Sequence, residues 1–540
     1  MKGVDLGYPS PAEFDDEVHD LVTARVASRI AAGDATVWGE AAESEAAKRL
    51  GWVNLPTTSA DLVPRILALR EELLAEGVDH VTLAGMGGSS LAPEVICATA
   101  GVPIEIVDTT DPAQVAEAIG TDLSRTVLVV ASKSGSTVET DSHRRAFAEA
   151  FRASGIDPRR RIVVVTDPGS PFQQLAEDEG YRAVFLADPN VGGRFSALSA
   201  FGLVPAGLAG ADIAGLLRDA AEYAPVLAAD DAENPAVRLG ALLGVAHARD
   251  TEKLVIASTD SPVVGFGAWL EQLLAESTGK DHKGILPVVV EDRNAPGFTD
   301  AHADSVLLFI GDAIGDHQPA SGYAAAVNLP LGALFQLWEH VTAIVGYSIG
   351  VNPFDQPDVE SAKVAARALL EAPANGEHTA PAFVDGPVEV HASPEVIGAA
   401  STLGEALAAL IDAADEYGYL AVQAFLDRNG DAHAAELRPL LARASGIQTT
   451  FGFGPRFLHS TGQYHKGGHP NGVFLQITGE NRADIVVPER PFTFGRLLAA
   501  QAAGDAQVLR DHGRPVLRLH LQDRSAGLAH IRQAVEGLLA

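Results

Sequence analysis

The sequence is poor in cysteine and in positive charge, and both shortages exclude whole classes of protein. It has a single cysteine, Cys97, in 540 residues, so an intrachain disulfide and a cysteine-rich metal site are excluded. Its 39 lysines and arginines are outnumbered by 71 acidic residues, which gives a formal net charge of −32. Because a phosphate backbone needs a basic surface, we expect no nucleic-acid partner.

Long apolar runs are also missing. The most apolar stretch, residues 329–351, is interrupted by Gln336, Glu339 and His340, which predicts a buried core helix and not a membrane span. The first residues lack the apolar centre of a signal peptide. A single cysteine fits a reducing compartment. We therefore expect a cytoplasmic protein with no membrane partner.

The chain is nevertheless long and apolar enough, at 47% hydrophobic residues, to form several packed cores. Residues 1–76 show amphipathic helical patterns without evident chemistry. From residue 79 onward, short β-branched runs alternate with helical stretches. The first runs lie at residues 80–84, 103–108, 125–131 and 161–166. Apolar strands separated by helices predict a parallel sheet that is covered on both faces.

A second series of strands and helices begins near residue 254 and ends with the core helix at 329–351. The predicted fold class is therefore α/β, with two tandem doubly wound domains, in which ligands lie beyond the carboxyl ends of the strands. We expect helices at 394–444 and strands at 472–478 and 515–521 further on. The predicted units are an N-terminal helical segment (1–76), the two sheet domains (77–230 and 231–375) and a smaller C-terminal α/β unit (376–540).

Two strand ends carry loops suited to an anion. The first reads Gly-Met-Gly-Gly-Ser-Ser at residues 85–90, where glycines let the main chain approach a ligand at the start of a helix. The second reads Ser-Lys-Ser-Gly-Ser-Thr at residues 132–137 and offers several donors and one cation. Either loop alone is more often an ordinary helix N-cap. Together, at the strand ends of one sheet, they predict a site for a phosphate monoester.

Glu276 lies near the end of an apolar helical pattern that stops at Gly279. A partly buried carboxylate beside a cation can act as a general base; the alternative is a helix cap or an ion pair with Lys280. Earlier in the chain, Val-Gly-Gly-Arg-Phe-Ser at residues 191–196 can place Arg194 against a ligand, where a fixed cation would stabilise an enolate. The alternative for Arg194 is an ordinary surface position.

These motifs, followed by Glu-Ser-Thr-Gly-Lys at 276–280 and Phe-Asp-Gln-Pro-Asp-Val-Glu-Ser-Ala-Lys at 354–363, resemble the glucose-6-phosphate isomerase family in kind and in order. The chain is similar in particular to the isomerase half of bacterial transaldolase and glucose-6-phosphate isomerase fusions. The resemblance implies two sugar-isomerase (SIS) domains within residues 77–375. It also implies interconversion of D-glucose 6-phosphate and D-fructose 6-phosphate through a cis-enediolate, in glycolysis and gluconeogenesis, with no metal and no other cofactor.

The resemblance also implies roles for individual residues. Glu276 corresponds to the base that moves a proton between C2 and C1, and Gln272 to a glutamine that contacts the substrate. Arg194 corresponds to the arginine that stabilises the enediolate, and Gln356 and Lys363 to residues at the ring-opening end. The residues that correspond to the phosphate-binding end are Gly88, Ser89, Ser132, Lys133, Ser134 and Thr137.

One family motif is missing. The family carries Gly-Gln-His-Ala-Phe soon after the base, and its histidine helps to open the sugar ring, but this chain has no such string there. A similar string, Leu-His-Ser-Thr-Gly-Gln-Tyr-His-Lys-Gly-Gly, occurs at residues 458–468. We hypothesise that His465, or as second choice His459, opens the ring. The alternative is that Lys363 does so with a water molecule.

Two other functions and the oligomeric state stay open at this level. The same loops would serve a dual phosphoglucose and phosphomannose isomerase, or a non-catalytic SIS module that senses sugar phosphates. A sensor would need only the phosphate loops, whereas this chain also has Glu276 and Arg194. The family resemblance implies a homodimer with a shared active site, but a histidine from the C-terminal unit could come from the same chain.

Overall fold

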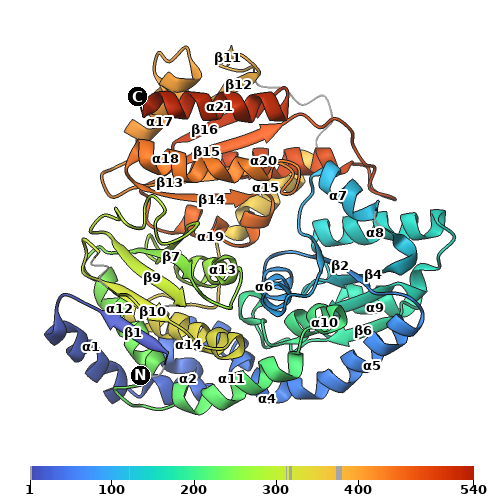
Figure 1. Ribbon diagram of the computed structural model, residues 1–540, viewed down its shortest axis with the longest axis horizontal. Coiled ribbons are helices and arrows are strands. Elements are labelled where there is room, and N and C mark those ends of the chain that lie inside the picture. Colours follow the sequence, from blue (N-terminus) through green and yellow to red (C-terminus); the bar gives the residue numbers. More distant parts are fainter. Residues whose placement is uncertain (1–2, 121, 312, 316–318, 372–379, 540) are drawn as a thin grey trace.

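The computed structural model describes residues 3–120, 122–311, 313–315, 319–371 and 380–539. These residues form three sheet-containing units around a common centre, with the N-terminal helices along the lower edge of two of them (Figure 1). No helix in the described ranges is long and apolar enough to cross a membrane. The predicted boundary between residues 375 and 376 lies outside the described residues.

The first sheet carries the two predicted anion loops. Its five strands are all parallel, in the order β3-β2-β4-β5-β6. Every residue of β4 and β5 is buried, as expected for strands covered by helices on both faces. The strands are β2 (His80–Gly85), β3 (Glu105–Val107), β4 (Thr126–Ala131), β5 (Ile162–Thr166) and β6 (Ala183–Leu186). The helices are α6 (Leu91–Ala100), α7 (Pro112–Ile119), α8 (Val138–Ala153), α9 (Pro171–Glu179) and α10 (Ala200–Ala209).

The second sheet has the order β1-β10-β9-β7-β8 and is parallel except for β1 at its edge. Together the first two sheets confirm the predicted pair of doubly wound domains. The strands are β1 (Val4–Gly7), β7 (Lys253–Thr259), β8 (Leu286–Val289), β9 (Ser305–Gly311) and β10 (Ala324–Val327). The helices are α11 (Ile213–Leu227), α12 (Pro235–His247), α13 (Phe266–Thr278) and α14 (Leu331–Ile349). The predicted core helix is α14.

The N-terminal segment is helical, as its pattern predicts, apart from β1. That strand is too short to show a period, and its partner β10 lies more than three hundred residues further along the chain, so it has no local signal. The helices are α1 (Pro11–Thr23), α2 (Val26–Ala31), α3 (Glu40–Ala46), α4 (Leu55–Thr58) and α5 (Leu62–Ala75).

The C-terminal unit is a third, mixed sheet in the order β11-β12-β16-β15-β13-β14. The stretch 394–444 is mostly helical, as predicted, but it also contains the buried interior strand β13. The strands are β11 (Phe383–Asp385), β12 (Val388–His391), β13 (Tyr419–Phe425), β14 (Gln448–Phe453), β15 (Gly472–Gly479) and β16 (Val516–Leu521). The helices are α15 (Val359–Glu371), α16 (Pro394–Ile397), α17 (Leu403–Asp412), α18 (Leu437–Ser445), α19 (Gly462–Gly467), α20 (Phe494–Asp511) and α21 (Arg524–Leu538).

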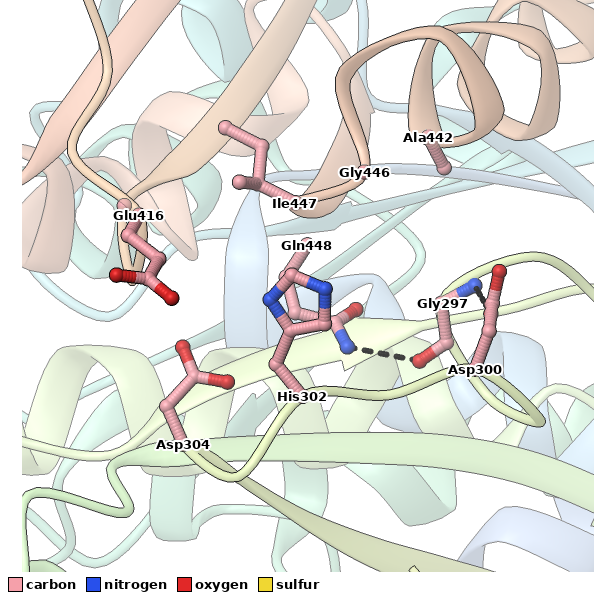
Figure 2. Close-up of a pocket in the computed structure, with 10 residues that line it drawn as sticks. Gly297, Asp300, His302, Asp304, Glu416, Ala442, Gly446, Ile447 and Gln448 are labelled. Atoms are coloured by element: carbon pink, nitrogen blue, oxygen red, sulfur yellow. Dashed lines mark hydrogen bonds between the residues drawn. The ribbon is translucent and has the colours of Figure 1, made fainter. Parts of the chain in front are cut away.

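The C-terminal unit packs against both preceding domains. On the first domain, Arg456 forms an ion pair with the buried Asp108, at 2.6 Å. On the second, the side-chain amide of Gln448 donates to the Gly297 carbonyl at 2.7 Å, beside a cavity of only about 10 Å³ that also borders His302 (Figure 2). A cavity of that size holds at most one water molecule. These contacts fix the C-terminal unit over the strand ends, where the larger pocket lies.

Candidate active site

A pocket of about 430 Å³ lies where the first two domains and the C-terminal unit meet. Every site residue predicted from the sequence lines it except His465. The lining residues are Arg49, Met86, Gly87, Gly88, Ser89, Ala131, Ser132, Lys133, Ser134, Thr137, Asp167, Gly192, Gly193, Arg194, Gln272, Glu276, Phe354, Gln356, Lys363 and His459. The volume suits a single small ligand.

The first loop packs tightly against the loop that carries Arg194. A Cβ atom on Gly88 would lie 1.9 Å from the carbonyl oxygen of Gly193, so only glycine allows the two loops to meet. The two serines of this loop have different surroundings. Ser89 lines the pocket, whereas the buried Ser90 hydroxyl donates to an Asp108 carboxylate oxygen at 3.0 Å. Gly88 thus serves the packing that brings the anion loop next to Arg194.

The second loop presents hydroxyls and one lysine at the start of α8. The Ser132 and Thr137 hydroxyls lie 2.9 Å apart. Lys133 forms an ion pair with Asp167, the residue that follows β5, and also donates to the Pro189 carbonyl at 3.2 Å. Burial raises the pKa of Asp167, and the neighbouring Lys133 opposes this shift. The loop therefore offers several donors to an oxyanion but only one lysine, which is already paired.

Glu276 lies in the last turn of α13, and both of its carboxylate oxygens have a neighbour. Oε1 is 3.4 Å from Nη1 of Arg194. Oε2 accepts a hydrogen bond from the side-chain amide of Gln272, one turn earlier, at 3.0 Å. The Glu276 side chain is 14% exposed, so one side remains open to the pocket. This is the predicted arrangement of a partly buried carboxylate beside a cation, and the alternative pair with Lys280 does not form.

Arg194 is held rigidly by groups from α13 and from the loop before α15. Its Nε donates to the Ser277 hydroxyl at 2.7 Å, and its Nη atoms donate to the Pro353 carbonyl at 2.7 Å and to the Gln356 side chain at 2.8 Å. Burial lowers the pKa of Arg194 and the charge of Glu276 opposes that shift, and a guanidinium remains protonated in proteins. Arg194 is therefore a fixed cation and not a surface residue.

Lys280 fixes the loop that carries Gln356. Its ammonium group donates to the Asn352 carbonyl and to the Asp355 carboxylate, each at 2.6 Å. Burial, aided by the charge of Arg194, lowers the pKa of Lys280 to about 8, although Asp355 raises it. Lys280 therefore positions the loop beside Arg194 without lining the pocket.

The structure places His465 outside the pocket, so the expectation that it reaches the sugar ring is wrong. Its side chain is 2% exposed and is enclosed by aromatic rings, among them Phe457 and Phe474. Its Nδ1 is 3.1 Å from the Tyr419 hydroxyl. Burial lowers the pKa of His465 well below its usual value. His465 is a neutral histidine of the core.

His459, the second choice, lines the pocket. Its Nε2 is 3.0 Å from Oε1 of Glu139, and its carbonyl accepts a hydrogen bond from Gln272 at 2.8 Å. Glu139 also accepts from Gln501 at 2.7 Å. Burial raises the pKa of Glu139, but its bonds and charge interaction with His459 outweigh burial and leave the pKa below its usual value. The C-terminal unit therefore supplies an oriented histidine within the same chain.

Sequence reasoning assigned no role to several other lining residues, among them Arg49, Asp167 and Phe354. Asp167 directly follows strand β5, and the rule that ligands lie beyond strand ends could have identified it. Phe354 belongs to a motif that was recognised for its other residues. Arg49 has no such signal, because it lies in the helical segment before the first sheet.

Comparisons with known proteins agree with this geometry. The family model described as phosphoglucose isomerase matches residues 73–290. A probable glucose-6-phosphate isomerase of Haloarcula marismortui is 30% identical over 353 residues, which cover 55% of this chain and 80% of the relative. Glucose-6-phosphate isomerase of Rubrobacter xylanophilus is 30% identical over 394 residues, 60% of this chain and 89% of the relative.

Solved structures share the fold. A hypothetical protein of Thermus thermophilus superposes with a TM-score of 0.58 at 26% identity, over 68% of this chain and all of that one. A glucose-6-phosphate isomerase of Chlamydia trachomatis superposes with a TM-score of 0.55 at 19% identity, over 68% of this chain and 88% of that one. At that lower identity the likeness concerns the fold alone.

Proposed function

The chain belongs to the glucose-6-phosphate isomerase family, and from that premise we propose that its pocket interconverts D-glucose 6-phosphate and D-fructose 6-phosphate. The observation that carries the proposal is the pair formed by Arg194 and Glu276, 3.4 Å apart, in the same pocket as the two anion loops. An aldose–ketose isomerase needs a base and a fixed cation at the reacting carbons, with the phosphate held elsewhere.

The phosphate group is bound by the two loops of the first sheet. Ser89, Ser132, Ser134 and Thr137 supply hydroxyl donors, and Lys133 supplies charge. This contact is remote from the carbons that react, so its binding energy serves to orient them. Gly88 lets the first loop lie against the Arg194 loop, which sets the distance between the phosphate and the reacting carbons.

Proton transfer is the role of Glu276. Its carboxylate removes the proton from C2 of the open-chain aldose and returns it to C1, on one face of the intermediate. Arg194 stabilises the negative charge of the cis-enediolate, since it is already in place and needs no rearrangement. Gln272 bonds to Glu276 and to the His459 carbonyl, so it ties the base to the other end of the pocket.

Ring opening is the role of His459, which replaces His465 in our hypothesis. Its imidazole moves a proton between the ring oxygen and the sugar hydroxyl at C1 or C2, and Glu139 holds the imidazole in the required orientation. Lys363 and Gln356 border the same pocket and bind the sugar at this end.

The proposal is tested by conversion of fructose 6-phosphate to glucose 6-phosphate in buffer treated with a chelator. We expect turnover, with deuterium from heavy water appearing at C2 of the product, because the base exchanges its proton with solvent. Binding of fructose 6-phosphate without conversion would favour the sensor function instead. Equal turnover of mannose 6-phosphate would indicate the dual phosphoglucose and phosphomannose isomerase.

A single chain carries all of the proposed groups, so we propose that catalysis needs no shared site, even if a homodimer forms. Lys133, Glu276 and His459 come from three units of one chain and line one pocket. We expect turnover per chain to stay constant on dilution into the low nanomolar range. Sedimentation measured in parallel reports the oligomer, and a loss of specific activity that follows dissociation would contradict the proposal.

We also propose that this reaction takes place in the cytoplasm. The binding partner that we propose is the small sugar phosphate, and we expect no nucleic-acid or membrane partner. The one cysteine, Cys97, is buried, which fits a reducing environment. The acidic excess opposes binding to nucleic acid.

A further inference from the structure

We propose that Arg49, from the N-terminal segment, is a phosphate-binding residue of this pocket. The inference rests on the proposed function only for the identity of the phosphorylated ligand. Arg49 lines the pocket together with Lys133 and Asp167. The N-terminal segment therefore does more than pack against the sheets, because the turn after α3 delivers a cation to the site.

The main chain beside Arg49 is fixed against the loop that also holds Lys133. The amide of Gly51 donates to the Asn190 carbonyl at 3.0 Å. Lys133 donates to the carbonyl of the preceding residue, Pro189, at 3.2 Å. Because both contacts fall on neighbouring residues of one loop, Arg49 lies at the phosphate end of the pocket.

Only one nitrogen of the Arg49 guanidinium is engaged in a hydrogen bond within the described residues. Its Nε donates at 2.8 Å to the carboxylate of Glu45, which lies four residues earlier near the end of α3. Within the described part of the chain, neither Nη atom of Arg49 has a hydrogen-bond partner. The side chain is 27% exposed, so it is anchored but not enclosed. A planar group held through Nε can present both Nη atoms to a phosphate oxygen.

At the phosphate end of the pocket, Lys133 alone does not balance the charge of a phosphate group. A phosphate monoester carries about −1.5 to −2 charges near pH 7. The charge of Lys133 is partly compensated by Asp167 and that of Arg49 by Glu45, so neither cation alone balances a phosphate, and the net charge of −32 repels anions. Burial raises the pKa of Asp167, and the charge of Arg49 is among the influences that lower it. The Arg49 guanidinium is therefore within electrostatic reach of the Lys133–Asp167 pair.

Calorimetric binding of glucitol 6-phosphate, a phosphorylated hexitol that cannot isomerise, tests the proposal. We expect Arg49→Met to raise Kd about tenfold or more, the usual loss for a hydrogen bond to a charged group. Arg49→Lys keeps the charge but cannot form a bidentate contact, so its Kd should lie between those of the wild type and Arg49→Met. With fructose 6-phosphate, KM should rise by a similar factor while kcat stays within about threefold, because Glu276 and Arg194 are untouched.

Arg29→Met is the matched control. It removes the same charge from the N-terminal segment, where Arg29 pairs with Asp34 and does not line the pocket, and we expect wild-type binding. A folded Arg49→Met protein that binds glucitol 6-phosphate as tightly as Arg29→Met does would overturn the proposal. So would a result in which Arg49→Lys loses affinity while Arg49→Met binds like the wild type. A wild type that binds the hexitol through Arg49 but converts no fructose 6-phosphate would refute the isomerase function and leave this inference standing.

Discussion

Replacement of Glu276 by glutamine should lower kcat for fructose 6-phosphate at least about a hundredfold, the usual contribution of a positioned general base. Glutamine has nearly the same shape and its carbonyl oxygen can still accept from Arg194, but its amide nitrogen cannot accept the hydrogen bond that Gln272 donates to the carboxylate. The pocket should therefore keep its geometry apart from that one bond. KM should change little, because the phosphate end is untouched. Steady-state kinetics in both directions, together with exchange of the C2 hydrogen with heavy water, measure the loss.

Glu271→Gln on the same helix is the matched control for this prediction. Burial raises the pKa of Glu271 to about 8, although Arg456 and a hydrogen bond from Ser460 oppose the shift. At pH 7 its carboxyl is mostly protonated, and glutamine mimics that neutral form. We expect wild-type kcat for Glu271→Gln. A Glu276→Gln protein within a few-fold of wild type would mean that another group removes the proton.

The architecture near the pocket could be predicted because local pattern and tertiary structure agree there. Strands β4 and β5 are unbroken apolar runs that end in loops rich in glycine or serine, and parallel strands bring such loops to one edge. Gly88 gives the first anion loop two roles. Its lack of a side chain lets the loop pack against Gly193, and it also lets the main chain approach a ligand.

Prediction failed where tertiary context decides the structure. Strand β10 is Ala-Ala-Ala-Val, and alanine favours a helix, so its pairing with β9 overrides local propensity. Strand β13 is buried on both faces and shows no alternation. Arg49 is far from every other site residue in sequence, and only the folded chain reveals its position.

The choice between His465 and His459 failed for a related reason. The two residues share one recognisable string, and similarity to a family motif does not say which ring faces the ligand. Packing decides: His465 lies in α19 and turns toward Tyr419, whereas His459 precedes that helix and borders the pocket.

Substitution of each histidine in turn therefore tests which of the two opens the ring. His459→Gln should lower turnover of cyclic glucose 6-phosphate about a hundredfold, because an amide cannot exchange the proton that an imidazole moves. Glutamine can still donate to the buried Glu139 carboxylate, so that carboxylate keeps a partner and the fold should persist. Binding of glucitol 6-phosphate should be retained, since that ligand has no ring to open.

His465→Phe is the comparison, because phenylalanine fits the aromatic surroundings of that site and should leave kcat near the wild-type value while lowering thermal stability. If turnover were slow only in His465→Phe, ring opening would be assigned to His465 instead. Wild-type turnover in both variants would assign ring opening to Lys363 with water. Glu139→Gln completes the test: if Glu139 acts by orienting His459, the double variant should be no slower than His459→Gln alone, since the second change removes a partner whose function is already lost.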